Sequence, residues 1–243
     1  MGAGDITYNK PSQREFYSLK SAHKIPCLGR YMQTRIEAME LKEALESKSA
    51  PKIKKAAIKI SKGKLGGYEE YLVNALKVLI QKPKSWQAQS EVIKALGITG
   101  STKTLPYLKE LSNQKFEAAI LYRHLGFSIC LLEDISSGSL VYAASVLKTS
   151  NDLLLSGVCA AILFSGFTPN DKEISQIIDS VADRNHDEGD IITPRCYIAA
   201  ACYSWAPDLT KSFLLKCTKS LWPALVEIAN DSLVGKKSKY VLI

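Results

Sequence analysis

Long hydrophobic runs are missing from this 243-residue sequence, which limits where the protein can work. The most apolar stretch, Leu153 to Phe167, is interrupted by Ser156, Gly157, Ser165 and Gly166. It therefore falls short of the roughly 18 uninterrupted apolar residues that a membrane-spanning helix needs. The first residues also lack the apolar centre of a secretory signal. Together these absences predict a cytoplasmic protein with no membrane partner.

Paired cysteines are missing: the cysteines are scattered, and no two of them are spaced as metal ligands usually are. Without a two-residue spacing or a neighbouring histidine, the sequence does not indicate a zinc site. Most of the cysteines are flanked by alanine, isoleucine or leucine, which favours reduced thiols in an apolar core. We therefore expect no metal and no disulfide at the six positions Cys27, Cys130, Cys159, Cys196, Cys202 and Cys217.

Catalytic motifs are also lacking. The three histidines, His23, His124 and His186, stand apart, and the sequence holds no HExxH, Gly-x-Ser-x-Gly or Walker motif. His124 lies in an apolar segment and favours a structural role. His186 and Asp187 belong to an acidic loop, for which a solvated connection is favoured over a cation site. The sequence predicts a protein that is not an enzyme and needs no cofactor.

Negative charge is scarce in the first quarter of the chain. Up to Lys64 there are fourteen lysines and arginines against six acidic residues, and the remaining eighteen basic residues are matched by eighteen acidic ones. The whole net charge of +8 therefore resides before Leu65. The positive charge of a short basic tail, with Lys236, Lys237 and Lys239, is balanced by an acidic cluster between Asp179 and Asp190. This asymmetry predicts a molecule that is electrically polar along its length.

What is present is a helix, a turn and a second antiparallel helix, best seen from Ser85 to Leu111. Gly97 and Gly100 are expected to end the first helix, and the second is expected to begin near Thr104. Apolar residues recur every three or four positions, as on the buried face of an amphipathic helix. These apolar positions are Ala88, Val92, Ile93, Ala95, Leu96, Leu105, Leu108 and Leu111.

Comparable pairs recur along the chain. The first helices are expected to end near Gly97, Leu131, Ser165 and Ser204, which lie 34 to 39 residues apart. Such a period resembles that of HEAT-repeat or armadillo-type proteins, which are α-solenoids. The expected helix pairs are 52–64 with 68–81, 85–97 with 104–111, 116–132 with 139–147, 152–164 with 173–182 and 194–205 with 209–217, followed by a last helix at 221–229.

The resemblance implies an all-α fold, a right-handed α-solenoid of about five HEAT-like hairpins with atypical capping ends. We expect three parts: an irregular N-terminal arm at 1–28, the solenoid at 29–234, and a basic C-terminal tail at 235–243. Asn170 with Glu173, and Thr193 before Pro194, are expected to begin helices.

Proteins of this kind usually hold another macromolecule, most often a protein, on a concave surface made by their second helices. The resemblance therefore implies a non-catalytic intracellular protein-binding module, such as an adaptor, an inhibitor or an immunity-type antitoxin. The identity of the partner protein is not indicated. The candidate protein-binding residues are Asn74, Lys77, Tyr107, Lys109, Tyr142, Gln176 and Lys211.

Nucleic-acid binding is the alternative, because lysines recur on one face of residues 52–64 and could follow phosphates. No aromatic residue stands among them to stack on bases. HEAT-like DNA glycosylases hold DNA in a basic groove, and this chain has Trp86, Trp205 and Trp222, although none matches a motif. The HEAT-like hydroxylases are excluded, because their His-Glu dipeptides are absent. The candidate nucleic-acid-binding residues are Lys52, Lys55, Lys59 and Lys62.

Overall fold

The computed structural model describes residues 26–184 and 193–239, and within them the regular structure is entirely helical. The side chains of residues 26–34, including that of Cys27, are not described. His23 in the predicted arm and the His186–Asp187 loop lie outside the described residues. The chain divides into two compact units, Met1–Ala44 and Leu45–Ile243. This division crosses the solenoid predicted for residues 29–234.

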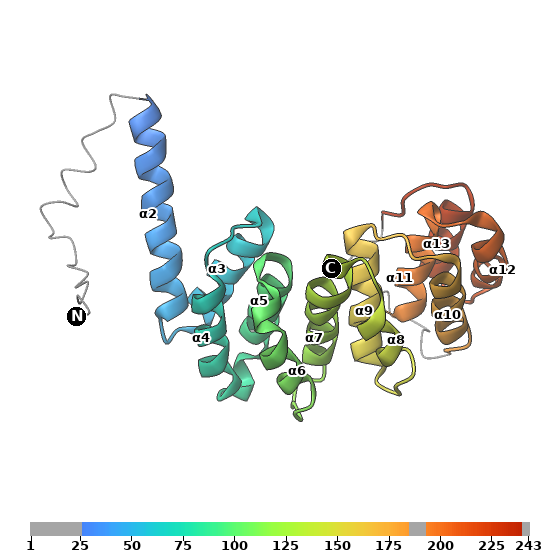
Figure 1. Cartoon of the computed structure of the whole chain (residues 1–243), viewed down its shortest axis with the longest axis horizontal. Coiled ribbons are helices and arrows are strands. Elements are labelled where there is room, and N and C mark those ends of the chain that lie inside the picture. The colour runs from blue at the N-terminus through green and yellow to red at the C-terminus, as the bar shows by residue number, and fades with distance from the viewer. Residues whose placement is uncertain (1–25, 185–192, 240–243) are drawn as a thin grey trace, which may run out of the picture. The chain divides into compact units, whose positions relative to one another are not determined.

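The first helix that the structure describes, α2, spans Pro26–Glu46. Residues 26–28, which the sequence assigned to an irregular arm, are therefore helical, because a proline is tolerated in the first turn of a helix. The α-helices of the second unit are α3 (Ala50–Gly63), α4 (Glu69–Ile80), α5 (Trp86–Thr99), α6 (Leu105–Ser112), α7 (Ile120–Cys130), α8 (Val141–Val146), α9 (Asp152–Ser165), α10 (Asp171–Ala182), α11 (Pro194–Ala201), α12 (Pro207–Cys217) and α13 (Pro223–Leu233) (Figure 1).

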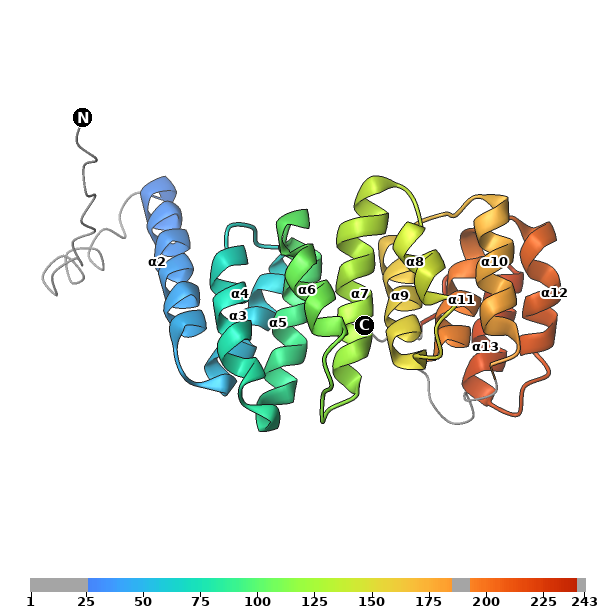
Figure 2. The same cartoon turned by 60° about the horizontal axis from the view of Figure 1, so that its bottom comes forward.

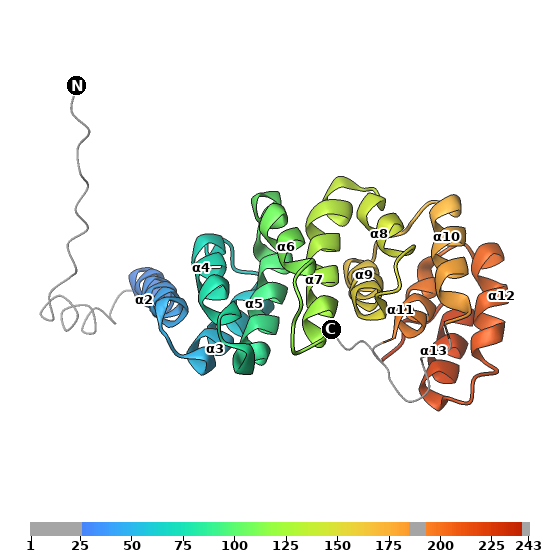
Figure 3. The ribbon, with the colours of Figure 1, turned by 90° about the horizontal axis from the view of Figure 1, so that it is seen from below.

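The helices of the second unit form two layers (Figure 2, Figure 3). In one layer, α3, α5, α7, α9, α11 and α13 each contact the next helix in the row. In the other layer, α4, α6, α8, α10 and α12 pack over them. We call these the odd layer and the even layer.

The pairing of the helices differs from the predicted hairpins. Three even helices make their main contacts with the odd helix that follows them: α4 packs on α5, α6 on α7 and α12 on α13. The sequence had paired each even helix with the odd helix before it. Apolar spacing shows that a helix has a buried face, but it does not show which of two flanking helices receives that face.

Gly97 was predicted to end a helix. Instead it lies buried inside α5, which continues to Thr99. A β-carbon at Gly97 would lie 2.6 Å from the α-carbon of Ser128 on α7, so the glycine allows these two helices to approach closely. Gly100 does follow the end of the helix. The prediction failed at Gly97 because a glycine can mark a close helix crossing as well as a helix end.

Other local predictions are confirmed. Asn170 and Glu173 form a capping box at the start of α10, and the Thr193 side chain accepts from the backbone N–H of Cys196 in α11. Leu96 and Leu108 are fully buried, while Leu105 is half-buried. The structure also contains a π-helical turn, Leu131–Ile135, which directly extends α7. This turn shifts the register of the chain just before α8 and was not predicted.

Candidate protein-binding surface

The seven residues proposed for protein binding all lie on the even layer. Asn74 and Lys77 belong to α4, Tyr107 and Lys109 to α6, and Tyr142 to α8, with Gln176 and Lys211 on α10 and α12. Asn74, Lys77, Gln176 and Lys211 are exposed, whereas the two tyrosines and Lys109 are half-buried. The structure brings four of these residues into contact, across three helices.

Lys77 on α4 stacks over a ring of the next even helix. Its Nζ lies 5.7 Å from the centre of the Tyr107 ring on α6, within the range of a cation–π interaction. Burial raises the pKa of the Tyr107 hydroxyl, with a further contribution from the charge of Glu110. Tyr107 therefore stays neutral at physiological pH and presents an intact aromatic face to the lysine.

Lys109 on α6 repeats this arrangement one helix further on. Its Nζ lies 6.0 Å from the centre of the Tyr142 ring and 2.5 Å from Oε2 of Glu133. The ammonium group is thus held between an aromatic ring and a carboxylate. Glu133, in the π-helical turn, was missed by sequence reasoning, because its partner Lys109 lies on another helix and no local pattern joins the two.

Asp134, the neighbour of Glu133, fixes the start of α8 and thereby the position of Tyr142. Its carboxylate accepts the backbone N–H groups of Tyr142 and Ala143 at 2.8 and 2.7 Å. The side chain is fully buried, and burial raises its pKa although these two hydrogen bonds act in the opposite direction. Asp134 was also missed, and its place after an apolar helix was the only available signal.

We call Lys77, Tyr107, Lys109, Tyr142 and Glu133 the lysine–tyrosine ladder. It runs over α4, α6 and α8 and joins helices of the even layer through side chains. The structure does not bring the other three candidates into it. Asn74 lines a groove beside α4, and Gln176 and Lys211 lie further along the layer on α10 and α12.

The candidate nucleic-acid-binding lysines lie on α3, in the odd layer. Lys52, Lys55, Lys59 and Lys62 are exposed, and the opposite side of the helix buries Ile53, Ala56, Ala57 and Ile60. They do not continue along the chain as Lys77 and Lys109, because those two lysines belong to the even layer. The basic face of α3 and the ladder are therefore separate features.

His124 and Trp205, which were considered for catalysis and base stacking, pack against other parts of the protein. Burial, reinforced by the charges of Arg123 and Lys94, lowers the pKa of His124 to about 3. Trp205 is buried, and its ring N–H donates to the carbonyl oxygen of Phe167 at 3.3 Å. Within residues 35–184 and 193–239, whose side chains are described, no three His, Cys, Asp or Glu side chains are grouped so that they could hold a metal ion.

Comparison of the chain with protein-family models, with curated proteins and with solved structures finds no match. Among the described residues, every helix is too short or too polar to cross a membrane.

Proposed function

We propose that the chain is a non-catalytic protein-binding module of the adaptor, inhibitor or immunity type, and that the lysine–tyrosine ladder is the centre of its binding surface. The observation that carries this proposal is the repeated stacking of a lysine on a tyrosine across α4, α6 and α8. We also propose that the two layers are a short right-handed α-solenoid of HEAT-like hairpins. The contact of each odd helix with the next supports this arrangement.

The chemistry of the ladder suits a protein partner. Tyrosine offers an apolar ring and a polar hydroxyl and is frequent at the centres of protein interfaces. A lysine held over a ring has already lost side-chain freedom, so fixing it in a complex costs less entropy. The exposed cation of Lys77 beside two half-buried rings would complement a partner that presents a carboxylate next to an apolar centre.

We propose that the ladder lies on the outer side of the stack, although the repeat resemblance implied a concave binding surface. The odd helices contact one another along their whole row, whereas within the even layer extensive contact is limited to α10 and α12. In a curved two-layer stack, the layer whose helices lie closer together is on the inside. We therefore place the ladder on the convex side, and not on the concave side that the repeat resemblance implied.

We also propose an intracellular location. Five cysteines, Cys130, Cys159, Cys196, Cys202 and Cys217, are buried, and none of them forms a disulfide. Reduced thiols throughout a core are typical of proteins that work in a reducing compartment.

Affinity purification from native cells with matched variants tests the function. We expect wild-type protein to retain a partner in stoichiometric amount, and the double variant Lys77→Ala/Tyr107→Ala to retain it about tenfold less. Lys115→Ala, an exposed lysine outside the ladder, is the control and should retain the partner fully. Equal retention by all three proteins would refute the ladder as the binding surface.

Nucleic-acid binding remains a second candidate, on one specific observation. Helix α3 carries exposed lysines and no acidic residue, so its basic face is not neutralised within the helix. Such a face can attract phosphates. An assay for release of alkylated bases from duplex DNA, made alongside the affinity purification, would support a glycosylase if it gave base release and DNA retention without any protein partner.

A further inference from the structure

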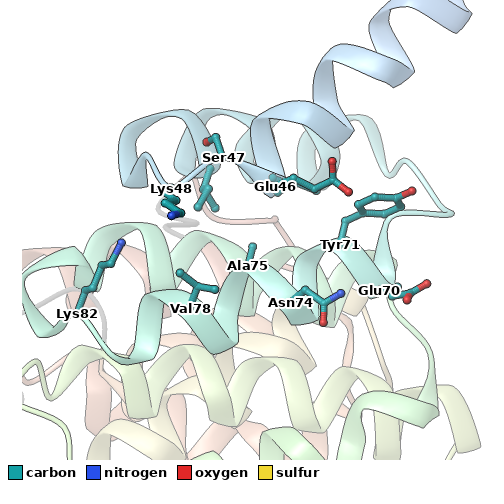
Figure 4. Close-up of a pocket in the computed structure, with 11 residues that line it drawn as sticks. Glu46, Ser47, Lys48, Glu70, Tyr71, Asn74, Ala75, Val78 and Lys82 are labelled. Atoms are coloured by element: carbon teal, nitrogen blue, oxygen red, sulfur yellow. The ribbon is translucent and has the colours of Figure 1, made fainter. Parts of the chain in front are cut away.

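A groove of about 570 Å³ lies along one side of α4 (Figure 4). Its walls are the last residues of α2, the turn that follows them, Ile53 of α3, and the side of α4 that carries Tyr71, Asn74 and Val78. All of these residues belong to the second unit, from Leu45 onward. The volume lies within the range of sites that bind ligands or peptide side chains.

The centre of the groove is apolar. Leu45, Ile53 and Ala75 are buried at its base, and Val78 stands in it with 46% of its surface exposed. Val78 lies in the last turn of α4 beside buried apolar side chains, and covering its exposed apolar surface would be favourable. The groove therefore suits an apolar side chain from a partner.

The two ends of the groove carry opposite charge. Glu70, near the start of α4, and Glu46 stand at one end, while Lys82, just after α4, and Lys48 stand at the other (Figure 4). All four side chains are exposed and so remain available to a partner. The groove is thus polar along the direction of α4, with an acidic end, an apolar centre and a basic end.

We infer that this groove docks an amphipathic helix of the partner protein, lying antiparallel to α4. Helices commonly carry acidic residues in their first turn and basic residues in their last turn, because the helix dipole favours both. In the antiparallel direction, the first turn of such a helix meets Lys48 and Lys82, and its last turn meets Glu46 and Glu70. Apolar residues spaced three or four apart on its face then meet Val78.

The opposite direction is disfavoured on the same grounds. A parallel helix would bring its acidic first turn to the two glutamates and its basic last turn to the two lysines. It would also align its dipole with that of α4, whose own first turn contains Glu69 and Glu70. The charges at the ends of the groove therefore select direction, while the apolar centre supplies affinity. This inference rests on the proposed protein-binding function and names the chemistry of the partner.

Two synthetic peptides of identical composition test the direction. Each has about 16 residues with leucines at helical spacing on an alanine background, long enough to form some helix. The forward peptide has glutamates in its first turn and lysines in its last, and the reversed peptide exchanges them. With the full chain at low salt, fluorescence anisotropy should show the forward peptide binding about fivefold or more tightly than the reversed peptide.

The forward peptide is also the better helix former, so it could bind more tightly for that reason alone. A protein with exchanged charges at the two ends of the groove distinguishes this effect from recognition by the groove. In the double variant Glu70→Lys/Lys82→Glu, the preference for the forward peptide should disappear or invert. An unchanged preference would refute the inference, because the selection would then come from the peptides and not from the groove.

The apolar centre is tested by Val78→Lys, which should weaken the forward peptide about tenfold. Val234→Lys, at a valine that is 77% exposed beyond α13, is the matched control and should bind as wild type does. If no peptide binds, or if both variants bind equally, the groove is not a helix-docking site. Retention of a native partner that still depends on Tyr107 would then show that the groove inference fails while the proposed function stands.

Discussion

The α-carbon of Gly157 on α9 lies against the backbone carbonyl of Arg123 on α7. A β-carbon at position 157 would lie 1.9 Å from the oxygen of that carbonyl, a distance that no real β-carbon adopts. Gly126 stands in the same relation to the carbonyl oxygen of Leu154, at 2.2 Å. The two glycines therefore allow α7 and α9 to cross at backbone contact, in the middle of the second unit.

Gly157→Ala is expected to destabilise the protein by about 3 kcal/mol or more, because the obstructing atoms belong to the backbone and cannot rotate away. Urea unfolding followed by circular dichroism measures this change in the free energy of unfolding. Gly66→Ala is the control, since no atom lies within 4 Å of a β-carbon there, and it should stay within about 0.5 kcal/mol of wild type. Similar stabilities for the two variants would contradict the crossing described here.

Leu108→Ala should lower the free energy of unfolding by about 2–5 kcal/mol, because Leu108 is fully buried on α6 and its removal leaves a cavity. Leu221→Ala is the matched control. Its side chain is 88% exposed, and we expect a change below about 0.5 kcal/mol. A negligible effect at Leu108 would mean that α6 does not pack as the structure shows.

Much of the secondary structure could be predicted from the sequence, because it depends on local chemistry. The capping box of Asn170 and Glu173, and the Thr193–Pro194 start of α11, are decided by neighbouring residues. Gly97 was misinterpreted because its role is not decided by neighbouring residues. Whether a glycine ends a helix or faces another helix depends on residues far away in sequence, here on Ser128.

The candidate surface could be predicted only in part. Lysines and tyrosines at exposed helical positions indicated which residues face outward, and Lys77, Tyr107, Lys109 and Tyr142 proved to lie together. Glu133 could not be found in this way, because its partner Lys109 lies on another helix and no local pattern joins the two residues. Neither could the groove, since its walls come from three separate helices.

Tyr142→Phe is expected to raise the free energy of unfolding by about 0.5–1.5 kcal/mol. Within the described part of the chain, the Tyr142 hydroxyl is buried without a hydrogen-bond partner, so its loss removes a desolvation penalty. Tyr197→Phe is the opposite case, because the Tyr197 hydroxyl accepts a hydrogen bond from Arg123, and it should destabilise by a similar amount. The two variants are compared by urea unfolding, and effects of the same sign would contradict this assignment.

His124 should make the protein less stable as the pH falls below about 6.5. Its folded-state pKa, lowered to about 3 by burial and by Arg123 and Lys94, lies below the unfolded-state value of 6.5. Between these values the unfolded chain binds a proton that the folded chain does not, so the free energy of unfolding falls with falling pH. From about pH 7 to about pH 4.5 this loss should amount to about 2–3 kcal/mol.

The variant His124→Gln isolates this contribution. It cannot titrate, so its loss of stability over the same pH range should be smaller than that of wild type by about 2–3 kcal/mol. Other titrating groups, including Asp134 with its raised pKa, are present in both proteins and cancel in the comparison. Parallel pH profiles would show that the His124 ring is already protonated, or solvated, in the folded state.

The triple variant Lys52→Glu/Lys55→Glu/Lys59→Glu decides whether the basic face of α3 binds an acidic partner. These side chains are exposed, so the melting temperature should hardly change. If the face binds phosphates, the affinity of wild type for a duplex DNA probe should fall steeply between about 50 mM and about 200 mM salt, and the variant should bind weakly with a flatter dependence. Reversal of Lys172, Lys216 and Lys219, also exposed, changes the net charge equally and is the control. DNA binding that both triple variants weaken alike would reflect net charge alone, and the lysines of α3 would then serve only to solvate their helix.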